Sequence, residues 1–111
     1  MAVTIMQGDS YAIFMNLTQN GFVLTPDMIN DLEVCVGANL RLSYSDDSVW
    51  FDDSTQRWYI WPTQEQTFGL EPGIHKVEIR VKYRNQNTTN VKGYVIIDKI
   101  KVNSAVSREV L

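Results

Sequence analysis

Short runs of alternating apolar and polar residues fill the chain, with turn-forming residues between them. The runs are rich in β-branched and aromatic side chains, which is typical of the strands of a β-sandwich or barrel. In the clearest run, Val77, Ile79 and Val81 alternate with charged residues. Because successive strand residues point to opposite faces of a sheet, one face of this strand is expected to be buried and the other exposed. The same pattern predicts strands near residues 2–7, 11–18, 32–36, 40–45, 48–52, 57–61, 74–84 and 90–102.

Two short helical turns are predicted between the strands. Thr25 precedes Pro26 and Asp27, an order typical of a helix N-terminus. Thr63 and Gln66 have the spacing of a capping box. Neither segment is expected to exceed two turns, so helix should make up less than about 15% of the chain, against the usual third.

Length and composition predict one domain over residues 1–111. A chain of 111 residues with 44% apolar and 21% charged residues is ordinary for one globular core. It contains no repeat, low-complexity tract or linker-like stretch. The expected fold is therefore an all-β, antiparallel sandwich with one or two short helical turns.

The N-terminus, the single cysteine and the net charge bear on where the protein acts. Residues 1–7 alternate like a strand and lack the features of a signal peptide, so synthesis and folding in the cytoplasm are expected. Cys35 has no second cysteine with which to form an internal disulfide. No apolar run approaches the roughly 20 residues of a membrane helix, and a net charge of −3 argues against nucleic-acid binding through bulk charge. We therefore expect neither a membrane nor a nucleic acid as partner.

Acidic and basic residues are separated along the chain. Residues 1–75 contain ten acids and two bases, whereas residues 76–111 contain three acids and eight bases. Glu78 interrupts the bases on one face of the predicted strand 74–84, and no aromatic residue lies between them, which favours a solvated face or a protein contact over nucleic-acid binding. If the acidic and basic regions lie on different sides, copies of the chain are expected to form a homo-oligomer, as a ring or a stack. The candidate contact residues on that face are Lys76, Arg80, Lys82 and Arg84.

Residues with catalytic or metal-binding chemistry are few. A nucleophilic pair of Cys35 and His75 is one interpretation, but Cys35 lies between two valines and His75 opens a strand, which favours a buried, inert thiol and an imidazole at a strand edge. One histidine and one cysteine do not make a zinc site. Four aspartates are more typical of solvated turns than of a calcium site or a glycosidase pair; they are Asp46, Asp47, Asp52 and Asp53. We expect no catalytic residue, metal ligand or cofactor, and no enzymatic activity.

Aromatic residues are dense between positions 50 and 61. Trp50, Tyr59 and Trp61 are candidates for a ligand platform, such as a surface on which sugar rings stack. Within the predicted strand, Trp58 shares one face with Ile60, and Tyr59 shares the other with Trp61. One of these faces should be core, so at most half of these side chains are available to a ligand.

Several segments resemble, in order, parts of small phage proteins. Gln7-Gly8-Asp9-Ser10 before an alternating strand resembles the opening of small phage tail and baseplate domains. Segment 57–67 resembles the hairpin followed by Thr-Gln-Glu-x-Thr in small prophage proteins of Gram-positive bacteria, and segment 77–82 resembles the strand that follows. Segment 102–111 is similar to their C-terminal tail. Asn87-Thr88-Thr89-Asn90 departs from the glycine-containing turn that relatives often have.

The resemblance implies an immunoglobulin-like or baseplate N-terminal-like β-sandwich and a structural role in the virion. It implies a protein of the tail or baseplate region that is made in the cytoplasm of the host bacterium and acts through contacts with other virion proteins. The resemblance brings no catalytic residues with it. The alternative is a carbohydrate- or receptor-binding β-sandwich module, with the aromatic residues as its site.

Overall fold

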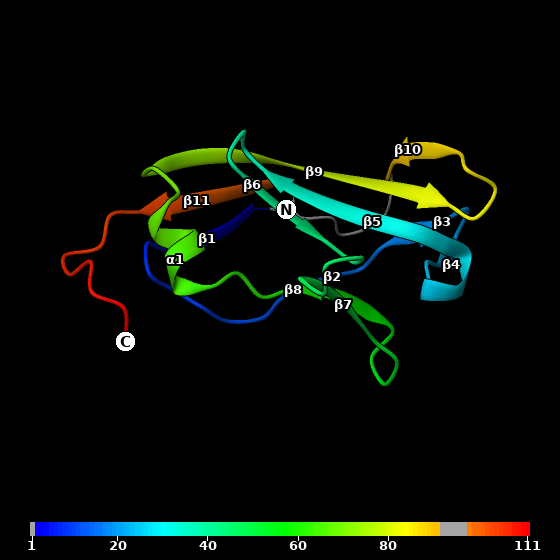
Figure 1. Cartoon of the computed structure of the whole chain (residues 1–111), viewed down its shortest axis with the longest axis horizontal. Helices are drawn as coiled ribbons and strands as arrows, with labels where there is room; N and C mark the ends of the chain where they lie inside the picture. Colours follow the sequence, from blue (N-terminus) through cyan, green and yellow to red (C-terminus); the bar gives the residue numbers. More distant parts are fainter. Residues whose placement is uncertain (1, 92–97) are drawn as a thin grey trace.

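Two β-sheets packed face to face carry most of the computed structural model, which describes residues 2–91 and 98–111 (Figure 1). The larger sheet has the order β1 (Ala2–Met6), β11 (Lys99–Asn103), β9 (Gly73–Tyr83), β5 (Ile29–Val36) and β6 (Leu40–Ser43), and β10 (Thr88–Asn90) also pairs with β9. The smaller sheet has the order β2 (Ile13–Met15), β8 (Arg57–Ile60) and β7 (Val49–Asp52). Strands β3 (Thr18–Gln19) and β4 (Phe22–Val23) form a separate hairpin. The helical segments are η1 (Pro26–Met28) and α1 (Gln64–Phe68).

This strand order defines an immunoglobulin-like sandwich. In the variable-type version of that fold, strands G, F, C and C′ share one sheet and strands B, E and D share the other. Here β11, β9, β5 and β6 take the first set of positions, and β2, β8 and β7 take the second. The predicted all-β, immunoglobulin-like sandwich is therefore confirmed. Its helical segments have three and five residues, well within the expected limit.

One strand pair departs from the predicted antiparallel arrangement. β1 runs parallel to β11, from Ala2 opposite Lys99 to Met6 opposite Asn103. The remaining pairs in the described ranges are antiparallel. After β1 the chain crosses to β2 in the smaller sheet, so β1 has no hairpin partner next to it in sequence. The prediction of a wholly antiparallel sandwich is wrong for this pair.

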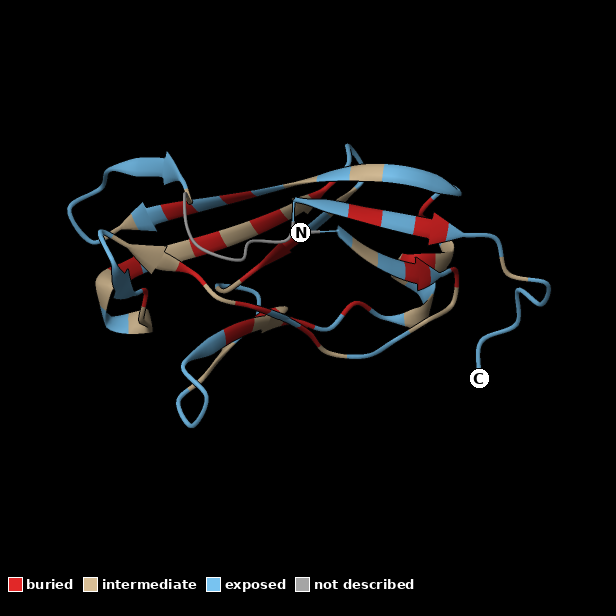
Figure 2. Cartoon of the chain, turned by 180° about the vertical axis from the view of Figure 1, so that it is seen from behind, coloured by how far each residue is buried: buried red, intermediate tan, exposed pale blue. Residues whose placement is uncertain are grey.

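The core lies between the sheets and consists mainly of buried apolar side chains that both sheets contribute (Figure 2). Along β9, Ile79 and Val81 are buried, whereas Arg80 and Lys82 are exposed. This confirms the two faces that the alternating pattern predicts. Because both sheets contribute, the core draws on segments from Ile5 to Val102.

Trp58 on β8 is one of the largest fully buried side chains, at 0% exposed. Its ring lies 5.6 Å from the ring of Tyr44 and 5.1 Å from that of Phe51, measured between centroids. Its indole N–H donates to the Leu24 carbonyl at 2.8 Å. The polar atom of this large side chain is therefore satisfied inside the core, as burial of an indole requires.

The structure divides two of the predicted strands. The predicted strand 11–18 separates into β2 and the start of β3. The β3–β4 hairpin was not predicted, although Asn20-Gly21 at its turn is the strongest short hairpin signal, because both central residues need positive φ. Asn20 has φ of 50° and Gly21 has φ of 82°. The first residue of the predicted strand 90–102 belongs to β10, and its residues 99–102 belong to β11. Residues 92–97 lie outside the described ranges.

Only one of the two predicted helix caps forms. At α1, the Gln66 N–H donates to the Thr63 hydroxyl at 3.1 Å and the Thr63 N–H donates to the Gln66 side chain at 2.8 Å, which confirms the capping box. At η1, Thr25 does not cap the helix, because its hydroxyl donates to the Asp27 carboxylate instead. This segment is a single 3₁₀ turn, after which Ile29 begins β5.

Two segments that carry the resemblance to phage proteins lie against each other. The Gly8 N–H donates to the Thr67 hydroxyl at 3.0 Å, and that hydroxyl donates to the Asp9 carbonyl at 2.8 Å. Gly8 has φ of 89°, and a Cβ atom there would lie 2.6 Å from Cζ of Phe68. Residues 7–10 and 63–67 therefore meet in one packed joint, and their contacts there are structural.

Arg108 ties the C-terminal segment to this joint. Gln7 is buried, and its side-chain NH₂ donates to the Leu70 carbonyl at 2.9 Å. The Gln7 side-chain oxygen accepts a hydrogen bond from Arg108 at 3.1 Å. Arg108 also donates to the Phe68 carbonyl at 3.1 Å, and its guanidinium lies 5.6 Å from the centre of the Phe68 ring. One buried glutamine thus links β1, the end of α1 and the C-terminal segment.

Candidate functional site

Three aromatic side chains form a row across the outer face of the smaller sheet. Phe14 on β2 is opposite Tyr59 on β8, and Tyr59 is opposite Trp50 on β7. The ring centroids of Phe14 and Tyr59 are 5.4 Å apart, as are those of Tyr59 and Trp50. Phe14 is 45% exposed and Trp50 is 37% exposed. These three residues are called the aromatic row below.

The alternation along β8 decides which aromatic residues are accessible. Trp58 and Ile60 are buried, whereas Tyr59 is half-buried and Trp61 is exposed. Of the residues of the predicted platform, the structure therefore places Trp50 and Tyr59 on the outer face of the smaller sheet and Trp61 in an exposed position just past the end of β8. On the paired strands, Trp58 is in the core and Phe51 packs against it, whereas Trp50 and Tyr59 lie on the other face, as the period of two requires.

Phe14 does not stand out in the sequence, although the structure places it in the row. Its neighbours Ile13 and Met15 are also apolar, and both are buried. A run that is apolar on both faces hides the period of two, so the pattern alone does not show which side chain faces outward. The register of β2 with β8 is what identifies Phe14.

The rings of the aromatic row pack against one another. Trp50 and Tyr59 are stacked with 25° between their planes, and Phe14 is tilted by 51° relative to Tyr59. Since β8 lies between β2 and β7, Tyr59 has a neighbouring ring on each side. A sugar stacks on an open aromatic face, and the faces within this row are largely taken. The row is therefore a continuous apolar strip rather than a set of open ring faces.

Carboxylates lie at both ends of strand β7, which carries Trp50. Two lie in the turn before the strand, one is its last residue and one follows it. Together they are called the acidic turns: Asp46, Asp47, Asp52 and Asp53. A hydrogen bond from the Ser48 hydroxyl lowers the pKa of Asp46, and one from the Ser54 hydroxyl lowers the pKa of Asp52. Both carboxylates are therefore ionised at neutral pH, and negative charge lies at each end of the strand that carries Trp50.

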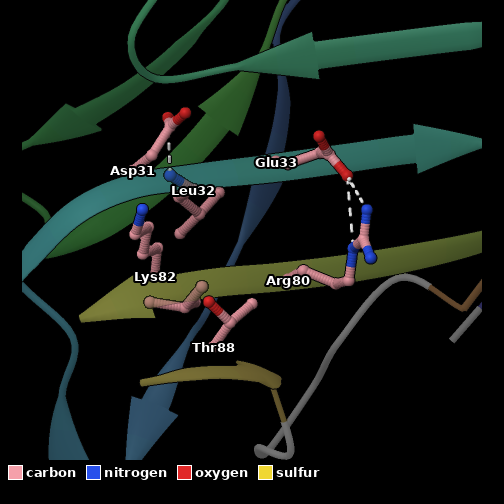
Figure 3. Close-up of a pocket in the computed structure, with 7 residues that line it drawn as sticks. Asp31, Leu32, Glu33, Arg80, Lys82 and Thr88 are labelled. Atoms are coloured by element: carbon pink, nitrogen blue, oxygen red, sulfur yellow. Dashed lines mark hydrogen bonds and ion pairs between the residues drawn. The ribbon is translucent and has the colours of Figure 1, made fainter. Parts of the chain in front are cut away.

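Part of the predicted basic row is matched by acids on the neighbouring strand (Figure 3). Arg80 donates to the Glu33 carboxylate at 2.7 and 3.2 Å, and Arg41 pairs with the same carboxylate at 3.2 Å. The hydrogen bond from Arg80 holds the pKa of Glu33 below its usual range. Lys82 is opposite Asp31 in the same strand pair. Asp31, Glu33, Arg80 and Lys82 border a shallow groove of about 220 Å³ on the outer face of the larger sheet.

At the other end of β9, like charges face each other. Lys76 is opposite Lys99, and Lys101 is opposite Ile74. The lysines are exposed, and Ile74 is 70% exposed. These four residues are called the lysine patch. The remaining base of the predicted row, Arg84, donates to the backbone and is not part of the patch.

Cys35 and His75 lie on opposite faces of the larger sheet, so they do not form a nucleophilic pair. His75 has the parity of the buried residues of β9, whereas Cys35 lies on the outer face beside Glu33. The prediction that Cys35 is buried is wrong. Val34 and Val36 take the core positions of β5 and leave the thiol half-buried. It donates to the Glu33 carboxylate at 3.2 Å.

Cys35 is expected to react slowly with thiol reagents. Burial, together with the hydrogen bond to Glu33, raises the pKa of the Cys35 thiol. Because the thiolate is the nucleophile, labelling near pH 7 should be slower in the native protein than in the urea-unfolded chain. The Glu33→Gln variant should label faster than the unchanged protein, since the negative charge beside the thiol is gone. Equal native rates with and without Glu33→Gln would contradict this account.

Neither a metal-binding cluster, a membrane-spanning helix nor a similar known protein was found for this chain, within the residues that the structure describes where the finding is structural. Within residues 2–91 and 98–111, no three or more His, Cys, Asp or Glu side chains are grouped to hold a metal ion. No helix in these ranges is long and apolar enough to span a membrane. No family model, curated protein or solved structure matches the chain.

Proposed function

We propose that this chain is a structural protein of a phage or prophage virion, in the tail or baseplate region. In this proposal it acts through contacts with other virion proteins and not as an enzyme. The ordered segments that resemble small phage proteins support the assignment to a virion. The observation that carries the mode of action is the aromatic row, which lies in register on an outer face of the sandwich.

An exposed aromatic strip suits a protein contact. The space between the sheets is filled by other side chains, Trp58 among them, so the row is not needed for the core. Exposed apolar patches mark interaction sites, and aromatic residues are enriched in the cores of interfaces. Tyr59 is held between two rings, so little side-chain freedom is left to lose on binding. The row is therefore an exposed and already ordered apolar surface, which favours binding of a partner.

Mass spectrometry of purified phage particles tests the virion role. Particles released from the bacterial strain that carries the gene should contain the chain in amounts comparable to other minor structural proteins. Particles that assemble and infect without any trace of the chain would overturn the proposal.

A variant of the row tests how the chain enters the particle. We expect Trp50→Ala to reduce incorporation while the purified variant stays folded, because Trp50 lies outside the core. Phe22→Ala is the matched control, since Phe22 is 74% exposed on the β3–β4 hairpin and is not part of the row. An equal loss of incorporation in both variants would contradict a specific role for the row.

A carbohydrate- or receptor-binding module is the second candidate, and Trp61 favours it. Trp61 is 49% exposed, and its indole N–H donates to the Ser10 hydroxyl at 3.2 Å, which fixes the ring. Glycan-array binding that is lost in Trp61→Ala or in Trp50→Ala would support this candidate. An array on which the unchanged protein binds no glycan would remove its carbohydrate-binding form.

A further inference from the structure

We infer that copies of this chain associate head to tail, with the aromatic row and acidic turns of one copy against the lysine patch of the next. The inference rests on the proposed function, because it names a second copy of the chain as one partner of the aromatic row. It concerns two surfaces that the fold places on different sheets.

The two surfaces face in opposite directions. The aromatic row is on the outer face of β2, β8 and β7, and the lysine patch is on the outer face of β9 and β11. Since the sheets pack face to face, their outer faces point away from each other (Figures 1 and 2). A contact between two different surfaces of the same chain is heterologous, and each added copy leaves one surface of each kind free. Assembly therefore continues as a stack or closes as a ring.

The surfaces are complementary in charge. At the β7 side of the aromatic row, the acidic turns place Asp52 and Asp53 at one end of the strand and Asp46 and Asp47 before the other, and these four carboxylates outnumber Arg57, which is opposite Asp52. In the lysine patch, three ammonium groups outnumber the nearby acids Asp98 and Glu78. Each surface therefore keeps a surplus of one sign, and the two signs are opposite.

The surfaces also match in their apolar parts. Ile74 is 70% exposed, opposite Lys101 and two residues from Lys76, and an exposed isoleucine on a sheet face gains by burial. The aromatic row offers a continuous apolar strip with carboxylates at its β7 side. When Ile74 lies on this strip, the apolar stems of Lys76 and Lys101 cover its flanks and their ammonium groups reach the acidic turns.

The inferred contact uses fewer basic residues than the row that the sequence suggests. Arg80 is already paired with Glu33, and Lys82 is opposite Asp31, so neither has its full charge to offer a partner. Contacts built on exposed charges are individually weak and are screened beyond roughly 10 Å at 0.1 M salt. The association is therefore expected at high protein concentration and low salt.

Light scattering at two salt concentrations is the first test. At about 1 mM protein and roughly 50 mM salt, the mass-average should exceed the 12.8 kDa of the monomer, and at about 0.5 M salt it should return to that value. A mass of 12.8 kDa under both conditions overturns the inference.

Two variants, each blocked on one surface, give a sharper test. Lys76→Glu with Lys101→Glu reverses the lysine patch, and Trp50→Ala with Asp53→Lys alters the other surface; each variant alone should be monomeric at low salt. Mixed in equal amounts they retain one intact surface of each kind, so they should form one-to-one dimers and nothing longer. Dimers of either variant alone, or no complex on mixing, would overturn the head-to-tail arrangement.

A matched single substitution separates the patch from the general charge of the strand. Lys76→Glu and Lys82→Glu make the same charge change on the same face of β9, six residues or about 20 Å apart. Lys76→Glu should weaken association about tenfold or more, whereas Lys82→Glu should leave it nearly unchanged. Equal weakening would show that net charge alone is responsible. If the chain is found in particles but is monomeric in every assay, the proposed function stands and only this inference fails.

Discussion

Replacing Trp58 by alanine should lower the free energy of unfolding by about 3–5 kcal/mol, as is usual for removal of a buried tryptophan. The indole is fully buried against Tyr44 and Phe51, so the change leaves a large cavity. It also leaves the Leu24 carbonyl without its donor. Since domains of this size are stable by about 5–15 kcal/mol, the variant should unfold at much lower urea concentration. Equilibrium denaturation followed by circular dichroism measures the change.

Two further substitutions make this result specific. Trp58→Phe keeps part of the packing but removes one ring and, with it, the donor to Leu24, so it should cost about 1–3 kcal/mol. Trp50→Ala removes an exposed ring that stacks on Tyr59, and it should cost about 1 kcal/mol or less. A loss for Trp50→Ala as large as that for Trp58→Ala would mean that the two faces of the hairpin are wrongly assigned.

Replacing Gly8 by alanine should destabilise the protein by about 2–4 kcal/mol. A residue with a side chain at φ of 89° is strained, which costs about 1–3 kcal/mol. The added Cβ atom would also lie 2.6 Å from Cζ of Phe68, and that ring is held in place by Arg108. Thermal or urea unfolding measures the sum of both effects.

Gly21→Ala is the control for the backbone part of this effect. Gly21 has φ of 82°, but an added Cβ atom there would meet nothing within 4 Å, so only the backbone strain remains. Combining Gly8→Ala with Phe68→Leu should recover part of the loss, because the shorter side chain removes the clash. A double-mutant cycle that shows simple additivity would mean that Phe68 moves aside at no cost.

The faces of the strands were predictable wherever one face is charged and the other is apolar. Strand 74–84 has this pattern, and Ile79 and Val81 lie in the core as expected. The same reasoning did not place Phe14, since β2 is apolar on both faces. It does not place the thiol of Cys35 either, because in a run of three apolar residues the pattern does not show which side chain faces outward.

Pairings between distant segments were not predictable from local pattern. Glu33 and Arg80 are 47 positions apart, and only the register of β5 with β9 brings them together. The sequence therefore does not show that Arg80 of the basic row is paired with an acid in the fold. The parallel pairing of β1 with β11 has the same origin, because neither strand carries a local signal of its partner.

That parallel pairing joins the first and the last of the described strands. β1 leaves the ribosome first, yet its partner β11 follows only after nearly all the other strands. Until then, the edge of β9 that β11 later covers is open, and an open edge is a template for strands of other chains. Pairings between such distant segments form slowly, on the millisecond-to-second scale. The nascent chain therefore has an unpaired edge on β9 until β11 is inserted between β9 and β1.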